Sequence, residues 1–121
     1  MTDITTSRRI LVVEDEVMIA MLMEDMLADL GHQVVGPATR LEDGLELANS
    51  AEFDLAVLDV NLNGVHSRPI ADVLVRRGVP FVLATGYGSG GGDGLAEAGH
   101  VLKKPFTPED LGQAIARVMA G

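Results

Sequence analysis

Carboxylates, a hydroxyl and an ammonium group follow short apolar runs at four separate places in the sequence. Glu14 and Asp15 come after the first run, Asp59 ends the third, Thr85 ends the fourth, and Lys104 follows the fifth. Three carboxylates that are crowded together repel one another unless a cation lies among them. An all-oxygen set of this kind suits Mg²⁺, which keeps several waters and can hold a phosphate oxygen. With a lysine and a hydroxyl to bind phosphoryl oxygens, the set favours phosphoryl transfer to an Asp carboxylate.

These residues can meet only if the apolar runs form neighbouring parallel strands. Most of the runs are continuous and rich in β-branched residues, as in strands with both faces covered. They are Ile10–Val13, Gln33–Val35, Leu55–Leu58, Phe81–Ala84 and Val101–Leu102. Amphipathic stretches lie between them, so we predict a doubly wound α/β fold with a five-stranded parallel sheet and helices on both of its faces. In such a sheet, ligand groups gather beyond the carboxyl ends of the strands.

Local signals mark the predicted helices. The first spans about 16–30, and the third spans about 67–77. The second begins at Thr39, whose partner Glu42 completes a capping box. The last helix carries an N-cap residue, a proline at the first helical position and an acid three residues after the cap, namely Thr107, Pro108 and Asp110.

The fourth strand-helix repeat departs from the pattern. Six of the 14 glycines lie in Gly86–Gly94, where a helix would be expected. Each glycine in a helix interior costs about 1 kcal/mol relative to alanine. We therefore expect a long loop there, with at most a short, weak fourth helix near Leu95–Ala98.

Composition narrows the class of protein. A chain of 121 residues that is 47% hydrophobic is expected to form one domain, here 9–121 after a flexible 1–8. The net charge of −9 repels phosphates, so we expect no nucleic-acid or membrane partner. The absence of cysteine excludes thiolate nucleophiles and zinc-thiolate sites. No apolar run approaches the ~20 residues of a membrane span, and no signal peptide is present, so we expect a cytoplasmic protein.

The order of the polar residues along the chain resembles that of the CheY-like receiver domains of two-component response regulators. The matching features are an acidic pair after the first strand, an Asp ending the third, a Thr ending the fourth and a Lys-Pro after the fifth. The resemblance covers essentially the whole chain, and it implies a flavodoxin-like sheet with the strand order 2-1-3-4-5. The segment PFVLATGYG at Pro80–Gly88 further resembles the FAT GUY subfamily, with Leu83 where the subfamily motif has Phe.

The resemblance implies a role for each acidic residue. Asp59 would accept the phosphoryl group, and a histidine kinase would donate it. Glu14, Asp15 and Asp59 itself would hold Mg²⁺ together with the backbone carbonyl of Asn61. The chain would thus be a phosphorylated switch rather than an enzyme, because it would catalyse only its own aspartyl phosphorylation and dephosphorylation.

The phosphoryl-binding residues implied by the resemblance are Thr85 and Lys104, with Gly86 and Tyr87 beside them. Receivers usually carry an inward-rotating aromatic three residues before the lysine, where this chain has Val101. Tyr87 is the natural substitute. We expect phosphorylation to order the glycine-rich segment that follows Thr85.

A partner surface is predicted on the first helix. Its stripe expected to face the sheet comprises Ile19, Leu22, Met26 and Leu30. Met18 and Met21 cannot both share that stripe, and exposed methionines make adaptable contact surfaces. In receivers this helix commonly helps to dock the kinase, so we expect a docking surface made of Met18, Met21, Pro105 and Phe106. By the same resemblance, the Lys104–Pro105 peptide bond is expected to be cis.

Besides the kinase, the resemblance implies a histidine phosphotransfer protein or a downstream regulator as partner, and a monomer or weak dimer. The chain stops after the last helix, so we expect a single-domain regulator. Two other classes are less favoured: a Mg²⁺-dependent phosphohydrolase would need a cap for substrate selection, and the acidic run Glu14–Glu16 would repel the phosphate of a flavin. The runner-up is a receiver-like docking module that works without phosphate.

Overall fold

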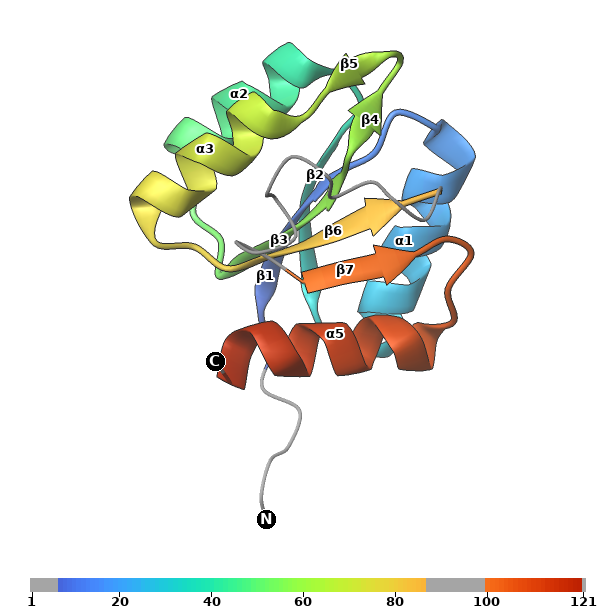
Figure 1. The fold of residues 1–121 in the computed structure, drawn as a ribbon. Coiled ribbons are helices and arrows are strands. Elements are labelled where there is room, and N and C mark those ends of the chain that lie inside the picture. The colour runs from blue at the N-terminus through green and yellow to red at the C-terminus, as the bar shows by residue number, and fades with distance from the viewer. Residues whose placement is uncertain (1–6, 87–99, 121) are drawn as a thin grey trace.

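The computed structural model describes residues 7–86 and 100–120, and a parallel sheet forms its centre (Figure 1). The strands of this sheet are β1 (Arg9–Val13), β2 (Gln33–Ala38), β3 (Leu55–Asp59), β6 (Phe81–Thr85) and β7 (His100–Lys103). Their order is β2-β1-β3-β6-β7, and each neighbouring pair is parallel. The predicted order 2-1-3-4-5 is confirmed, because β6 and β7 are the fourth and fifth strands of this sheet.

Helices cover both faces of the sheet. Within the described ranges they are α1 (Val17–Asp29), α2 (Leu41–Ser50), α3 (Arg68–Arg77) and α5 (Pro108–Ala120). Helices α1 and α5 pack on one face, and α2 and α3 pack on the other (Figure 1). No helix in the described part of the chain is long and apolar enough to cross a membrane.

The continuous apolar character of the strands follows from this two-sided burial. In β3, Leu55 and Val57 belong to the cluster under α1 and α5, whereas Ala56 and Leu58 belong to the cluster under α2 and α3. All four residues are fully buried. Because successive strand residues point to opposite faces, a strand between two helical layers must be apolar at every position.

A small hairpin lies between β3 and α3 and was not predicted. Its strands are β4 (Asn61–Leu62) and β5 (Val65–His66), which pair antiparallel outside the main sheet. Asn63 and Gly64 connect them, and both have positive φ, at 55° and 84°. Positive φ at two central residues is typical of the tight type I′ hairpin turn, for which Asn-Gly is a favoured pair.

The predicted capping box of the second helix is wrong. Strand β2 runs to Ala38, three residues beyond the predicted end, so α2 begins later, with Arg40 as its N-cap residue and no side-chain cap hydrogen bond. Glu42 instead forms an exposed ion pair with Arg40 at 3.3 Å. Thr39 lies before the cap position and therefore cannot bind the first amides of the helix.

The stripe of α1 that faces the sheet is also corrected. Ala20, Met23 and Leu27 are the buried residues of α1, and Leu22 is 55% exposed. The other members of the predicted stripe, Ile19, Met26 and Leu30, are partly buried and pack against the core under α1 and α5, so the prediction is wrong only for Leu22. Met18 and Met21 are exposed, as predicted.

The capping box of the last helix is confirmed. The hydroxyl Oγ1 of Thr107 accepts the Asp110 N–H at 3.0 Å, and the Asp110 carboxylate accepts the Thr107 N–H at 3.0 Å. This reciprocal pair fixes the start of α5 just after β7. The predicted loop within Gly86–Gly94 and the short helix near Leu95–Ala98 lie outside the described residues, apart from Gly86, and so does most of the predicted flexible N-terminus.

Two threonines that precede helices are expected to differ in their contribution to stability. Thr107→Ala removes a hydroxyl that caps α5, so we expect it to lower the free energy of unfolding by about 1 kcal/mol. Thr39→Ala is the matched control, because its hydroxyl caps no helix, and we expect a change below about 0.5 kcal/mol. Urea denaturation of both variants measures the difference, and an equal loss in the two would contradict the assignment of the caps.

Candidate functional site

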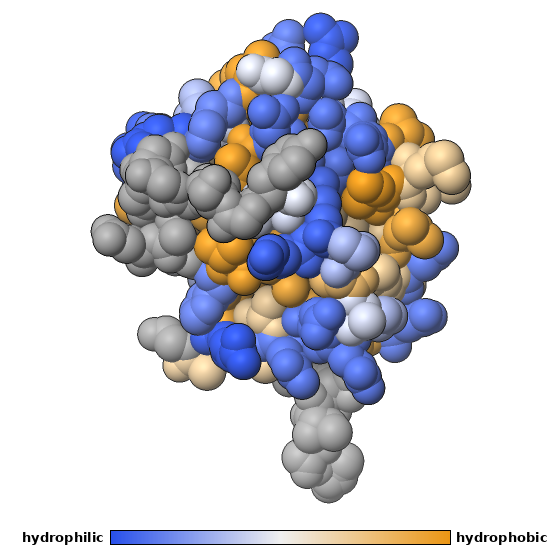
Figure 2. Space-filling model, turned by 45° about the vertical axis from the view of Figure 1, so that its right-hand side comes forward, coloured by the Kyte–Doolittle hydropathy of each residue, from blue (hydrophilic) through white to orange (hydrophobic). Residues whose placement is uncertain are grey.

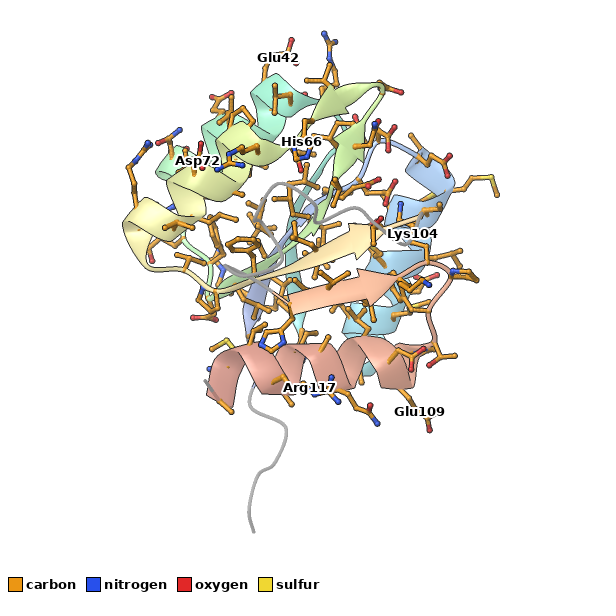
Figure 3. The ribbon with its side chains drawn as sticks, viewed as in Figure 1. Glu42, His66, Asp72, Lys104, Glu109 and Arg117 are labelled. Atoms are coloured by element: carbon orange, nitrogen blue, oxygen red, sulfur yellow. The ribbon has the colours of Figure 1, made fainter. Side chains whose placement is uncertain are left out.

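The predicted site residues meet at the carboxyl edge of the sheet. Glu14 and Asp15 directly follow β1, Asp59 and Thr85 are the last residues of β3 and β6, and Lys104 directly follows β7. Figure 3 shows the Lys104 side chain beside the carboxyl ends of β6 and β7. The structure therefore brings together five residues that are far apart in the sequence.

A partly buried ammonium group connects two of the carboxylates. The Nζ atom of Lys104 lies 2.8 Å from Oε1 of Glu14 and 2.9 Å from Oδ2 of Asp59. The Glu14 side chain is fully buried, and that of Asp59 is 8% exposed. One positive charge thus faces two buried negative charges, with the Asp15 carboxylate beside them.

Backbone amides hold the remaining carboxylate oxygens. Oε2 of Glu14 accepts the Glu16 N–H at 3.1 Å, and Oδ1 of Asp59 accepts the Asn61 N–H at 3.2 Å. Oδ2 of Asp15 accepts the Asn63 N–H at 2.9 Å. These bonds fix the orientation of all three side chains.

Burial and hydrogen bonds change the proton affinities of these groups. Burial raises the pKa of Glu14 to about 7, against the opposing effect of its hydrogen bond with Lys104. Burial alone would lower the pKa of Lys104, but its bonds to Glu14 and Asp59 outweigh burial and raise that pKa, so the ammonium stays charged. Burial alone would raise the pKa of Asp15, yet hydrogen bonds, first among them the one from the Asn63 N–H, hold it below the usual value.

The donor set fits a hard divalent cation. Glu14, Asp15 and Asp59 each offer a carboxylate oxygen, and these oxygens all lie within 4.8 Å of one another. Oxygen ligands in this number, in a site open to water on one side, match the preference of Mg²⁺. A cation here would favour the ionised form of Glu14 and so oppose the effect of burial on its pKa.

An open cleft gives access to the carboxylates. It has a volume of about 720 Å³ and is lined by Asp15, Asp59, Asn61, Thr85 and Lys104, among others. An apolar pocket of about 360 Å³ lies beside it, between α1 and the segment that follows β7. Gly86 and Lys104 line both hollows, so the charged site and the apolar pocket are continuous.

Most of the predicted site residues lie in the cleft or in the apolar pocket beside it. Their functional roles stay predictions. Pro105 and Phe106 line the apolar pocket, and the Lys104–Pro105 bond is cis, as predicted. Tyr87 lies outside the described residues. Val101, in the position usual for the switch aromatic, is 42% exposed on β7.

Sequence reasoning missed two residues of the hairpin, Asn63 and His66. Asn63 binds Asp15 through its amide, and His66 lines the cleft. Figure 3 shows His66 on the side of the site nearest α3. The dipeptide Asn63–Gly64 was the signal available in the sequence, because Asn-Gly is a strong marker of a two-residue hairpin turn.

Replacing Glu14 by Gln is expected to flatten the pH dependence of stability when EDTA is present. The folded protein binds the Glu14 proton more tightly than the unfolded chain, since the pKa is raised from 4.5 to about 7. This contribution to stability is therefore complete below the unfolded value and is lost as the pH rises through 7. From about pH 5 to about pH 8, we expect the free energy of unfolding of the wild type to fall by about 2 kcal/mol more than that of Glu14→Gln.

Glu16→Gln is the control for this measurement, because Glu16 is exposed. It should keep the pH dependence of the wild type in urea denaturation. Equal pH dependence in the wild type and Glu14→Gln would contradict the raised pKa.

The chain is similar in sequence to known regulatory proteins. The model of the response regulator receiver domain family matches residues 10–116. The transcriptional regulatory protein PdtaR of Mycobacterium tuberculosis is 31% identical over 119 residues, with 93% of this chain and 57% of PdtaR aligned. The phyllosphere-induced regulator PhyR of Methylorubrum extorquens is 29% identical, with 91% of this chain and 43% of PhyR aligned. This chain thus spans about half the length of these curated relatives.

A solved structure agrees with both the fold and the sequence relationship. The solution structure of SdrG from Sphingomonas melonis Fr1 is 39% identical and superimposes with a TM-score of 0.81, covering 92% of this chain and 95% of SdrG. The family match includes every strand-end residue of the cleft, from Glu14 to Lys104. The chain therefore belongs to the response regulator receiver domain family of two-component signalling.

Proposed function

We propose that this receiver domain is a phosphorylated switch in which Asp59 accepts a phosphoryl group from a histidine kinase. The observation that carries the proposal is the contact of 2.9 Å between the Lys104 ammonium and the Asp59 carboxylate, at the open cleft and beside two further carboxylates. A carboxylate oxygen can attack the phosphorus atom of a donor that enters this cleft. A phosphorus–oxygen bond then forms as the bond to the donor nitrogen breaks.

Lys104 has the central part in this reaction. In the unphosphorylated protein its ammonium binds Asp59 and Glu14, so the positive charge is in place before a donor arrives. On transfer, the ammonium can exchange its contact with Asp59 for a phosphoryl oxygen, where negative charge accumulates. Thr85 is buried at the end of β6 and lines the cleft, so its hydroxyl is within the site that the phosphoryl group would enter.

Mg²⁺ is the cofactor that the carboxylates fit. Glu14, Asp15 and Asp59 would hold it, with the backbone carbonyl of Asn61 as a further ligand. When bound, Mg²⁺ would supply positive charge to the phosphoryl oxygens. The proposed activity is confined to the chain's own aspartyl group, and the proposal includes no turnover of outside substrates.

The proposed output is protein contact, phosphate relay or a phosphate sink. Figure 2 shows apolar surface on the side of the molecule where α1 lies. On α1 the large exposed apolar residues are Val17, Met18, Met21 and Leu22. The adjoining apolar pocket is lined by Pro105 and Phe106. This docking surface lies next to the cleft. A kinase bound to it would therefore be close enough for its phosphohistidine to reach Asp59.

Phosphorylation by a small donor tests the acceptor. Incubation with acetyl phosphate and Mg²⁺ is expected to add one phosphoryl mass to the wild type, and EDTA added beforehand should prevent the gain. Asp59→Asn should show no gain because the nucleophile is removed, whereas Asp43→Asn, at an exposed residue of α2, should behave as wild type. A phosphoryl group on Asp59→Asn would rule out Asp59 as the acceptor. If Asp59→Asn cannot be phosphorylated but still binds the partner as the wild type does, the phosphate-independent docking module would be favoured instead.

A charge on the docking surface should separate docking from chemistry. Met18→Glu places a carboxylate on a residue that is 78% exposed, so we expect transfer from the cognate kinase to slow by about tenfold or more. Transfer from acetyl phosphate should be unchanged, because Met18 does not line the cleft. Val75→Glu, on the exposed face of α3, is the control and should slow neither reaction. The kinase is found by screening a panel of autophosphorylated histidine kinases. If Met18→Glu and Val75→Glu slow transfer from this kinase equally, the proposed docking surface is wrong.

A further inference from the structure

The β4–β5 hairpin stands outside the main sheet but is anchored at its base. Leu62 is 2% exposed and packs in the cluster under α2 and α3. Asn61 pairs with His66 and Leu62 pairs with Val65, so the tip carries only Asn63 and Gly64. Figure 1 shows the hairpin beside the segment that joins β1 to α1, where Asp15 lies.

The hairpin amides bind the carboxylates of the site. The Asn63 N–H donates to Oδ2 of Asp15 across 48 positions of sequence, and the Asn61 N–H donates to Oδ1 of Asp59. Within the hairpin, the Gly64 N–H donates to Oδ1 of Asn61 at 2.7 Å, which fixes the turn relative to β4. Two of the three carboxylates of the cation site are therefore held by one small element.

Asp15 depends most on this support. Glu14 and Asp59 are buried and bind Lys104, whereas Asp15 is partly exposed and has no such ion pair among the described contacts. Its charge is close to two like charges, which favour rotation of the side chain toward water. The amide of Asn63 opposes that rotation, and it contributes to the lowered pKa that keeps Asp15 ionised.

We propose that the β4–β5 hairpin is a positioning element of the cation site, in which the Asn63 amide fixes the Asp15 carboxylate and so raises the affinity for Mg²⁺. The inference rests on the cation site of the proposed function. Groups that orient metal ligands from outside the coordination sphere typically change metal affinity by about 10–100-fold. Because coupling is reciprocal, Mg²⁺ in turn stabilises the hairpin turn.

The turn glycine offers a test with a matched control. Gly64 and Gly78 both have positive φ, at 84° and 73°, and a Cβ atom added to either meets no atom within 4 Å. Valine at either position strains the backbone by a similar mechanism, but only Gly64 lies in the hairpin. Gly78 ends α3 and is remote from the cleft.

Calorimetric titration with Mg²⁺ alone gives the first readout, after circular dichroism has shown that the variants are folded. Gly64→Val is expected to weaken Mg²⁺ binding by about tenfold, and Gly78→Val by less than about twofold. Unchanged affinity in Gly64→Val would overturn the proposal. Tighter binding would also overturn it, since it would mean that the hairpin competes with the cation for Asp15.

Amide hydrogen exchange of the wild type gives a second readout that needs no variant. Saturation with Mg²⁺ is expected to slow exchange at Asn63 by about tenfold, and exchange that stays equal or becomes faster would refute the coupling. If the wild type binds Mg²⁺ but the expected changes in Gly64→Val affinity and in Asn63 exchange are not observed, the positioning role is wrong and the cation site remains supported. If the wild type binds no Mg²⁺, the cation site and the positioning role are both wrong.

Discussion

The contact of the partly buried Lys104 ammonium with the buried carboxylates of Glu14 and Asp59 is the interaction on which the rest of the site depends. Burying charged groups is costly unless they are paired and hydrogen-bonded, so the pairing must be accurate. The parallel register of the sheet provides that accuracy: Val13 aligns with Leu58, and Thr85 aligns with Lys103. The Lys104 N–H also donates to the Thr85 carbonyl at 2.8 Å, which ties the lysine to the end of β6.

The charges at this edge do not balance, and the imbalance explains what the site is suited to bind. One ammonium lies among three carboxylates and contacts two of them, while burial raises the pKa of Glu14 and hydrogen bonds keep Asp15 ionised. A purely structural ion pair would have no use for a third carboxylate at the mouth of an open cleft. The surplus favours a divalent cation, and the cation together with Lys104 favours an anionic phosphoryl group at Asp59.

The strand ends and the last helix were predictable because their signals are local and strong. Apolar strands covered on both faces stand out as continuous runs, and the residues that follow them reach the same edge in any open parallel sheet. The box of Thr107 and Asp110 depends only on residues three positions apart. The order of strand-end residues therefore predicts which side chains meet at this edge of the sheet.

The failures have physical reasons of their own. Seven consecutive apolar residues, Val17–Met23, leave the rotation of α1 undetermined, so Leu22 was assigned to the sheet although it is exposed. Thr39 was taken as a cap because the extension of β2 through Ala38 has no local signal. The strands of the hairpin have two residues each, too few to show any periodicity, and therefore only Asn63–Gly64 could have revealed it.

The most direct test of the account locates the phosphoryl group. Borohydride reduces an aspartyl phosphate to homoserine, so peptide mapping after kinase-dependent phosphorylation identifies the modified residue. The account predicts homoserine at Asp59 and at no other acidic residue. Homoserine at Asp15, the five-carbon alcohol 2-amino-5-hydroxyvaleric acid at Glu14, or no reduced residue at all after incubation with a kinase that phosphorylates the chain, would contradict it.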